Sequence, residues 1–216
     1  YYFRTAPYPN WHDNAFDSVV HAMSVMGTGG FSNYDKSAGL PNEATSTHII
    51  AGGLQNTTSE WILAIFMGFA GMNFSLWYVV LFGKKRWSIF KNSELRWYWI
   101  VIIGTTLLIA YFLKIHHFYP TIEQTLRYAF FNVTTIISTT GLGNWDFVNW
   151  PVEAIGVLFV CFLVGGMVGS TAGGPKVARF IIAYKYLKQQ IHNFVYGAED
   201  NTFTVDGTEY NGKKPA

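Results

Sequence analysis

Residues 164–183 read VGGMVGSTAGGPKVARFIIA and separate an apolar run that begins at Ala154 from a second run that ends at Leu187. Glycine and proline weaken a helix, and Pro175 also removes one backbone hydrogen-bond donor. In a membrane, non-helical backbone is tolerated only inside protein or beside a water-filled cavity. Residues 152–187 are therefore predicted to form a membrane span that is broken beside an aqueous path, and such broken helices mark ion and substrate sites in transporters.

The predicted break, which we call the glycine-rich loop (residues 165–176), has the composition of a turn. Its small and polar residues are Gly165, Gly166, Gly169, Ser170, Thr171, Gly173, Gly174 and Lys176. Close helix packing is an alternative explanation for these glycines. The run GSTAGGPK is not a phosphate-binding loop, because a proline separates the last glycine from the lysine. It is not a nucleophile elbow either, because Thr171 occupies the central position that serine takes in G-x-S-x-G.

The composition is that of an integral membrane protein. Half of the 216 residues are hydrophobic and only 13% are charged, whereas about a quarter are charged in a soluble domain. The net charge of +2 offers no basic surface for nucleic acid. The sequence contains no nucleophile–base pair, metal-ligand cluster or paired carboxylates. We therefore expect an all-α polytopic membrane protein that is not an enzyme and holds no bound cofactor.

Residues 1–96 are predicted to contain most of one structural unit. The apolar segment 14–26 is too short to cross a bilayer, which takes roughly 20 residues, and this favours a re-entrant half-helix. It leads into residues 27–31 (GTGGF), which we call the first T-G loop. Residues 60–82 are predicted to span the membrane. Residues 83–96 carry five basic side chains against one acid, and such a short basic loop is expected to be cytoplasmic.

Residues 97–187 are predicted to contain a complete unit of the same kind. A span is expected at 97–113 and a second half-helix at 121–138. Residues 139–143 (TTGLG), the second T-G loop, follow this half-helix. The broken span 152–187 then closes the unit. The order helix, short helix, T-G loop, helix thus indicates helix–pore-loop–helix repeats, of which this chain holds a partial set.

The charge pattern also predicts orientation. Basic residues cluster at the end of the broken span: Lys176, Arg179, Lys185 and Lys188. This end is therefore expected in the cytoplasm, and both T-G loops on the outer side. Residues 188–216 are predicted to be a polar cytoplasmic tail, in which Asp-Gly at 206–207 and Asn-Gly at 211–212 favour a small hairpin.

The two units are similar in sequence. A shift of 112 positions sets residues 28–29 (TG) on residues 140–141 (TG). With this shift, residues 33–35 (NYD) match residues 144–146 (NWD) one residue out of step. The ordered pattern predicts that both T-G loops do the same task.

The T-G loops have the residue types that a binding site for a dehydrated alkali cation needs. Backbone carbonyls can replace the hydration shell of the ion, glycine lets successive carbonyls turn toward one axis, and threonine adds a hydroxyl oxygen. Each half-helix directs its negative carbonyl end at the loop. The residues predicted to line such a cation site are Thr28, Gly29, Gly30, Thr139, Thr140 and Gly141.

Three motifs resemble a known family. Residues 26–32 (MGTGGFS), 137–143 (ISTTGLG) and 169–180 (GSTAGGPKVARF) resemble the second and third pore repeats of the Trk/Ktr/HKT potassium transporters, and in particular the bacterial Trk membrane subunits. The resemblance covers nearly the whole chain. It implies a cell-membrane protein that takes up K⁺ through a pore with four filter strands.

The resemblance also implies particular roles for residues and partners. The filter glycines would correspond to Gly29 and Gly141, and Thr28 and Thr140 would line the potassium site beside them. The glycine-rich loop would be a gate below the filter. The family further implies a homodimer and a cytosolic nucleotide-binding regulatory subunit.

Several alternatives stay open at the level of sequence. Only two filter strands are present and the chain opens at Tyr1 without an initiator methionine, so we expect a fragment of a longer protein. A sodium-coupled or sodium-permeable relative is one alternative to a potassium transporter. A membrane scaffold whose glycines only pack helices is another. Lys176 is either a barrier to cations in the gate or a cytoplasmic anchor.

Overall fold

The computed structural model describes residues 11–33, 37, 57–83, 86–144, 146–196, 202–205 and 208–211. The helices are α1 (Trp11–Met26), α2 (Thr57–Ala70), α3 (Phe74–Phe82), α4 (Ser93–Ile115), α5 (Ile122–Ile137), α6 (Val152–Leu163) and α7 (Val177–Tyr196). Two 3₁₀ turns, η1 (Arg86–Lys91) and η2 (Phe147–Asn149), connect them, and β1 (Thr202–Val205) and β2 (Thr208–Asn211) form an antiparallel pair. The expected units 1–96 and 188–216 therefore lie partly outside the described residues.

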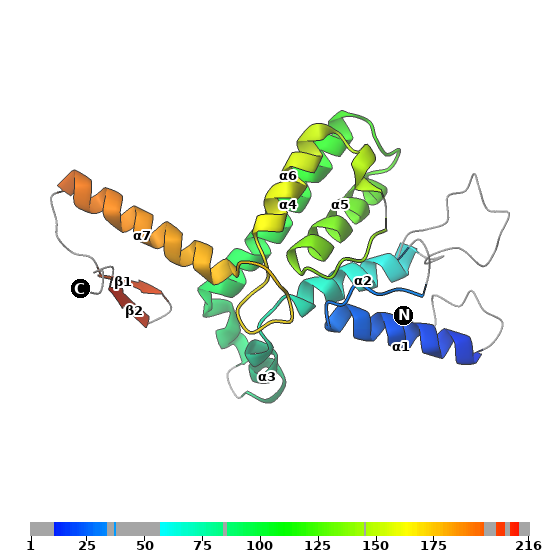
Figure 1. The fold of residues 1–216 in the computed structure, drawn as a ribbon, viewed down its shortest axis with the longest axis horizontal. Helices are drawn as coiled ribbons and strands as arrows, with labels where there is room; N and C mark the ends of the chain where they lie inside the picture. The colour runs from blue at the N-terminus through cyan, green and yellow to red at the C-terminus, as the bar shows by residue number, and fades with distance from the viewer. Residues whose placement is uncertain are drawn as a thin grey trace.

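The larger apolar core lies among α4, α5 and α6, which pack against one another (Figure 1). On α4 the fully buried side chains are Tyr98, Ile102, Ile109 and Leu113. Their spacing puts them along one face of a helix, as expected for a segment with one packed side. Asn92 caps the start of this helix, because its side-chain oxygen accepts the Leu95 N–H at 2.9 Å.

A smaller apolar cluster joins α1, α2 and α5. Its buried members are Val25, Leu63, Ala64, Met67, Phe131 and Leu142. Leu142 belongs to the second T-G loop, so this loop is packed into the helices rather than lying on their surface. The hydroxyl of Tyr98 on α4 donates to the Gly68 carbonyl of α2 at 2.7 Å and ties the two clusters together.

The predicted span 60–82 is wrong as a single helix. The structure divides it into α2 and α3, which meet at an angle of 102°. Asn73 explains the break, because its side chain caps α3 by accepting the Ser75 N–H at 2.7 Å. Among the described residues α4 alone is long and apolar enough to cross a membrane as one helix, and the bent pair α2–α3 qualifies only when both are counted together.

Other boundaries also differ from the sequence expectations. The first short helix begins at Trp11, three residues before the predicted start at 14. The span predicted at 97–113 is α4, which begins at Ser93 and so includes the end of the predicted basic loop 83–96. The last helix, α7, continues to Tyr196 and includes the start of the predicted tail. The hairpin expected in that tail is confirmed, with Val205 paired to Thr208.

Candidate functional site

Both T-G loops leave their short helix with the same hydrogen bonds. In the first loop the Gly29 N–H bonds to the Ser24 carbonyl at 2.7 Å. In the second loop the Thr140 N–H bonds to the Thr135 carbonyl at 2.9 Å. Each bond reaches back five residues to a carbonyl of the last helical turn, so the ends of α1 and α5 determine how each loop departs.

The two loops also share an unusual pattern of backbone angles. Thr28 and Thr139 have φ values of 50° and 53°, and Gly30 and Gly141 have φ values of 72° and 85°. A positive φ is easy for glycine but strained for a β-branched residue such as threonine. Strained threonines at matching places require surroundings that hold them there.

These matches correct the sequence alignment of the two units. Thr28 matches Thr139 and Gly30 matches Gly141, which is a shift of 111 positions and not the predicted 112. The counterpart of Gly141 is therefore Gly30, and Gly29 corresponds to Thr140. The shift of 111 also brings residues 33–35 into step with residues 144–146. The shift of 112 was wrong because the Thr-Gly dipeptides at residues 28–29 and 140–141 have different conformations.

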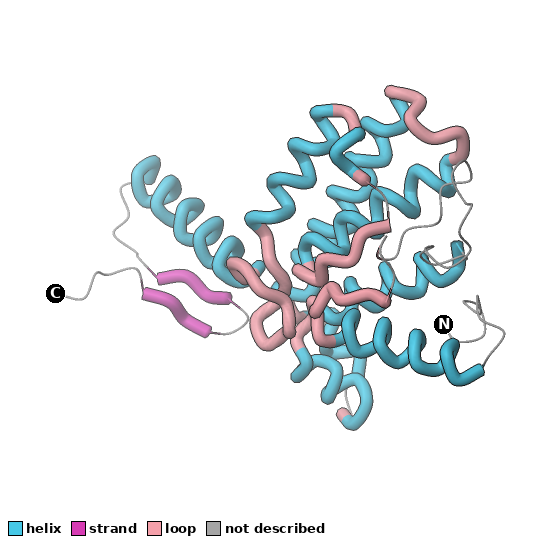
Figure 2. The backbone as a smooth tube through the Cα atoms, turned by 45° about the vertical axis from the view of Figure 1, so that its right-hand side comes forward, coloured by secondary structure: helices cyan, strands magenta, loops and turns pink. Residues whose placement is uncertain are grey.

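The two T-G loops lie against each other. A Cβ atom placed on Gly30 would overlap the carbonyl oxygen of Thr140. A Cβ atom on Gly141 would lie 3.9 Å from the Cα atom of Gly30. Figure 2 shows several loop segments meeting between the helices, in the middle of the molecule. The six residues predicted from sequence thus come together from two units.

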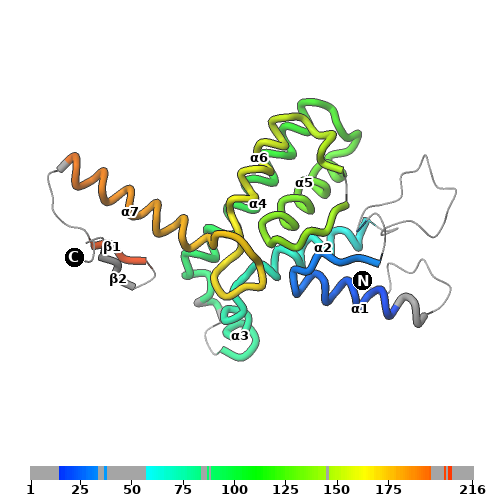
Figure 3. The backbone as a smooth tube through the Cα atoms, viewed as in Figure 1, coloured from blue at the N-terminus to red at the C-terminus, as the bar shows by residue number. Residues whose placement is uncertain are grey.

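The glycine-rich loop connects α6 to α7 (Figure 3) and is hydrogen-bonded to both T-G loops. The hydroxyl of Thr28 shares its one proton between the Thr171 carbonyl at 3.0 Å and the Gly27 carbonyl at 2.8 Å. The hydroxyl of Thr139 accepts the Gly173 N–H at 2.6 Å. The two strained threonines therefore hold the same short segment, one as donor and the other as acceptor.

Glycine is needed at several points of this loop because the backbone passes close to itself. A Cβ atom on Gly165 would lie 2.5 Å from the Gly173 carbonyl oxygen, and one on Gly166 would lie 2.5 Å from the Cβ of Ala172. Gly169 and Gly174 have φ values of 75° and 72°. Helix packing alone does not account for such contacts, because they are made within the loop itself.

The break between α2 and α3 is hydrogen-bonded to the glycine-rich loop. The Met167 N–H bonds to the Gly71 carbonyl at 2.9 Å, and the Phe74 N–H bonds to the Gly169 carbonyl at 3.0 Å. The gap between α2 and α3 thus satisfies its free backbone groups with the second broken segment. Such mutual satisfaction is what non-helical backbone in a membrane requires.

Two charged side chains also hold the glycine-rich loop. The carboxylate of Glu94, in the first turn of α4, accepts the Val168 N–H at 2.8 Å. The ammonium group of Lys176 donates to the Ala172 carbonyl. Lys176 is half-buried. It belongs to the loop and not to α7, because α7 begins at Val177.

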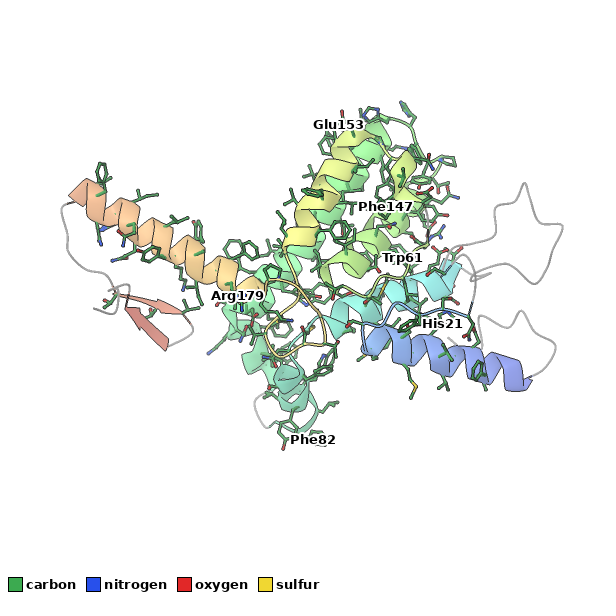
Figure 4. The ribbon with its side chains drawn as sticks, in the orientation of Figure 1. His21, Trp61, Phe82, Phe147, Glu153 and Arg179 are labelled. Atoms are coloured by element: carbon green, nitrogen blue, oxygen red, sulfur yellow. The ribbon has the colours of Figure 1, made fainter. Side chains whose placement is uncertain are left out.

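A buried polar cluster behind the second T-G loop was not predicted. The guanidinium of Arg127 on α5 lies 2.5 Å from the carboxylate of Glu60 on α2, and Asn144 donates to the same carboxylate at 3.1 Å. Glu123 at the surface contacts both Arg127 and Trp61 at 3.0 Å. Figure 4 shows Trp61 on α2 beside α5. A sequence signal existed, because charged residues in apolar membrane segments are functional candidates.

The class of the protein follows from comparison with known families. A family model described as "TrkH: Cation transport protein" matches residues 8–202. The chain therefore belongs to the TrkH family of cation transport proteins. Among the residues that the structure describes, no group of three or more His, Cys, Asp or Glu side chains could hold a metal ion.

Particular relatives share this sequence and fold. The chain is 30% identical over 187 residues to the Trk system potassium uptake protein TrkH of Salmonella typhimurium, covering 84% of this chain and 36% of that protein. It is 28% identical over 177 residues to the Trk system potassium uptake protein TrkG of Escherichia coli, covering 82% and 34%. The crystal structure of the potassium transporter TrkH from Vibrio parahaemolyticus superposes with a TM-score of 0.73 at 25% identity, covering 89% of this chain and 39% of that chain. The chain thus spans about a third of the length of the curated relatives that it matches.

Proposed function

We propose that this chain forms half of the ion path of a potassium uptake protein in the cell membrane. The observation that carries the proposal is the pair of T-G loops, which lie against each other with the same backbone angles and end at the same glycine-rich loop. The names of the relatives support potassium as the transported ion. No step of this function requires an enzyme's catalytic groups or a bound cofactor.

In this proposal the T-G loops are two of four filter strands. The carbonyl groups of Thr28–Gly30 and Thr139–Gly141 replace the water around a K⁺ ion, as carbonyl rings do in potassium filters. The carbonyl ends of α1 and α5 add roughly half an elementary negative charge each at the same place. This chain supplies two strands of the four, so the ion path is complete only with two further strands.

The glycine-rich loop is proposed to be the gate. Its hydrogen bonds to the hydroxyls of Thr28 and Thr139 hold it against the inner end of both T-G loops, where it obstructs the path. Opening requires that these bonds break. The ammonium group of Lys176 adds a positive charge that repels cations while the loop is closed.

The proposed partners are the lipid bilayer, a second copy of the protein and a cytosolic nucleotide-binding subunit. The outward face of α4 is apolar and suits lipid. α7 also exposes an apolar stripe with helical spacing, which suits contact with a second copy: Phe180, Tyr184, Leu187, Ile191 and Phe194. Residues 83–96 and 188–216 are proposed to face the cytoplasm and the T-G loops the outside.

The proposal is tested by uptake of radioactive Rb⁺, a substitute for K⁺, in bacteria that lack their own potassium uptake systems. The full-length gene product should restore growth at low K⁺ and take up Rb⁺. A tenfold excess of Na⁺ should leave most of the Rb⁺ uptake unchanged. Equal competition by Na⁺ would indicate the sodium-permeable relative. A protein that reaches the membrane and moves neither ion would be a scaffold, and the proposal would then be wrong.

A further inference from the structure

The buried cluster behind the second T-G loop connects the two units of the chain. Glu60 is 0% exposed in the first turn of α2, and Arg127 is 3% exposed on α5. Their side chains meet at 2.5 Å across 67 positions of sequence. α2 belongs to the unit of the first T-G loop, whereas α5 leads directly into the second one, so this ion pair fixes one unit relative to the other.

The same carboxylate also holds the outer end of the second T-G loop. Asn144 lies three residues after Gly141, and its side-chain N–H donates to Glu60 at 3.1 Å. The Asn144 side-chain oxygen in turn accepts an N–H of Asn132, which lies on α5, at 3.1 Å. Because Asn144 is bound at both ends of its amide group, the loop cannot shift at this point without breaking a buried hydrogen bond.

This arrangement is costly as a device for stability alone. A buried ion pair loses much of the hydration of both charges, and apolar residues of the same size often stabilise a fold as well or better. One carboxylate oxygen of Glu60, Oε1, accepts no hydrogen bond from the described residues. A charge kept in such a place, next to a loop that must hold its shape, indicates a positioning role.

We propose that Glu60, Arg127 and Asn144 form a clamp that holds the second T-G loop in the geometry that discriminates K⁺ from Na⁺. The inference rests on the proposed transport function and names residues that set the selectivity of the same site. A filter made of carbonyl groups favours K⁺ only while these groups keep their number and spacing around the ion. With the clamp removed, the second loop can close around the smaller Na⁺ ion.

The first test measures selectivity in the full-length protein. Asn144→Leu keeps the shape of the side chain but removes the tether, and the Rb⁺ over Na⁺ preference should fall by about tenfold, the usual effect of losing a hydrogen bond to a charged group. Glu60→Gln should have a smaller effect, because an amide oxygen can still accept from Asn144. The control Glu153→Gln changes a half-exposed carboxylate on α6 outside the clamp and should leave the preference unchanged.

A preference is a ratio of two uptake rates, so it does not depend on how much protein reaches the membrane. If Asn144→Leu fails to accumulate, Glu60→Gln keeps the same size and provides the test. An unchanged preference in both variants, at normal amounts of protein, would overturn the clamp while leaving the transport function intact.

A second measurement does not depend on transport. Cys161 is the one cysteine of residues 1–216 and is buried, so Cys161→Ala with Gly143→Cys, in a full-length protein whose other cysteines are replaced, places a single reactive thiol in the second T-G loop. A Cβ atom at Gly143 meets no atom of the described residues within 4 Å. Reaction with a maleimide should be about tenfold faster when Asn144→Leu is added. An unchanged labelling rate would contradict the clamp, whether or not the wild-type protein transports an ion. A wild-type protein that transports no ion would refute the proposed function instead.

Discussion

The two T-G loops have the same backbone course but different supports. In the first loop the side chain of Phe31 is 76% exposed, whereas its counterpart Leu142 is fully buried among α1, α2 and α5. Beyond the first loop, Asn33 donates to Asp17 of the short helix in its own unit at 3.3 Å. Its counterpart Asn144 donates to Glu60 on α2, a helix of the other unit.

Local and distant interactions therefore determine different properties of a loop. Both loops share the hydrogen bond to the last turn of their short helix and a glycine at positive φ, and these local features accompany their common shape. The position of each loop depends on whatever packs behind it. Here His21 and Asn132 occupy matching places on α1 and α5, and both are buried. His21 binds Ser32 at 3.0 Å, so a different side chain does a similar task in each unit.

The largest predicted effect concerns the glycines at positive φ. Gly30→Ala should abolish Rb⁺ uptake, because the added Cβ would overlap the Thr140 carbonyl oxygen and the positive φ would be strained as well. Gly141→Ala meets only the strain, about 1–2 kcal/mol, and should lower uptake by roughly tenfold. Gly143→Ala in the same loop meets no described residue within 4 Å and is the matched control. Equal losses at Gly30 and Gly141 would contradict the close contact of the two loops.

The second prediction compares the apolar residues that follow these glycines. Leu142→Ala should lower the free energy of unfolding by about 2–5 kcal/mol, because it leaves a cavity in a packed cluster. Phe31→Ala should change it by less than about 0.5 kcal/mol, as at an exposed site. Thermal unfolding of the purified full-length protein measures both. A large loss with Phe31→Ala would mean that another segment or subunit covers the first loop.

The smallest predicted effect concerns the hydroxyl groups that hold the gate. Thr139→Val removes the acceptor of the Gly173 N–H and should destabilise the closed gate by about 0.5–1.5 kcal/mol. Rb⁺ uptake should therefore rise by roughly two- to tenfold, while Thr139→Ser should behave like the wild type. A fall in uptake with Thr139→Val would indicate that this hydroxyl matters more as an ion ligand than as a gate contact.

The sequence was sufficient for the parts that depend on short-range chemistry. The length of the apolar segments predicted the short helices, and the glycines and Pro175 predicted the break between α6 and α7, which the structure has. The break at Asn73 was missed, because an apolar segment of sufficient length concealed a capping residue. The loop alignment was one residue out of step, because conformation and not residue identity defines the match.

The contacts that join distant segments could not be predicted from the sequence. Glu60 and Arg127 stand 67 positions apart, and nothing in either local pattern pairs them. The hydrogen bonds from Thr28 and Thr139 to the glycine-rich loop likewise depend on how the helices pack. Such contacts follow from tertiary structure, and they explain how the loops are held in place.

The central claim is that the two T-G loops bind the transported ion together. Crystals of the full-length protein grown with Rb⁺ would test this through the anomalous scattering of the ion. The account predicts an anomalous peak within coordination distance of backbone carbonyl oxygens from both Thr28–Gly30 and Thr139–Gly141. A peak bound by one loop alone, or ordered loops without a peak between them, would contradict it.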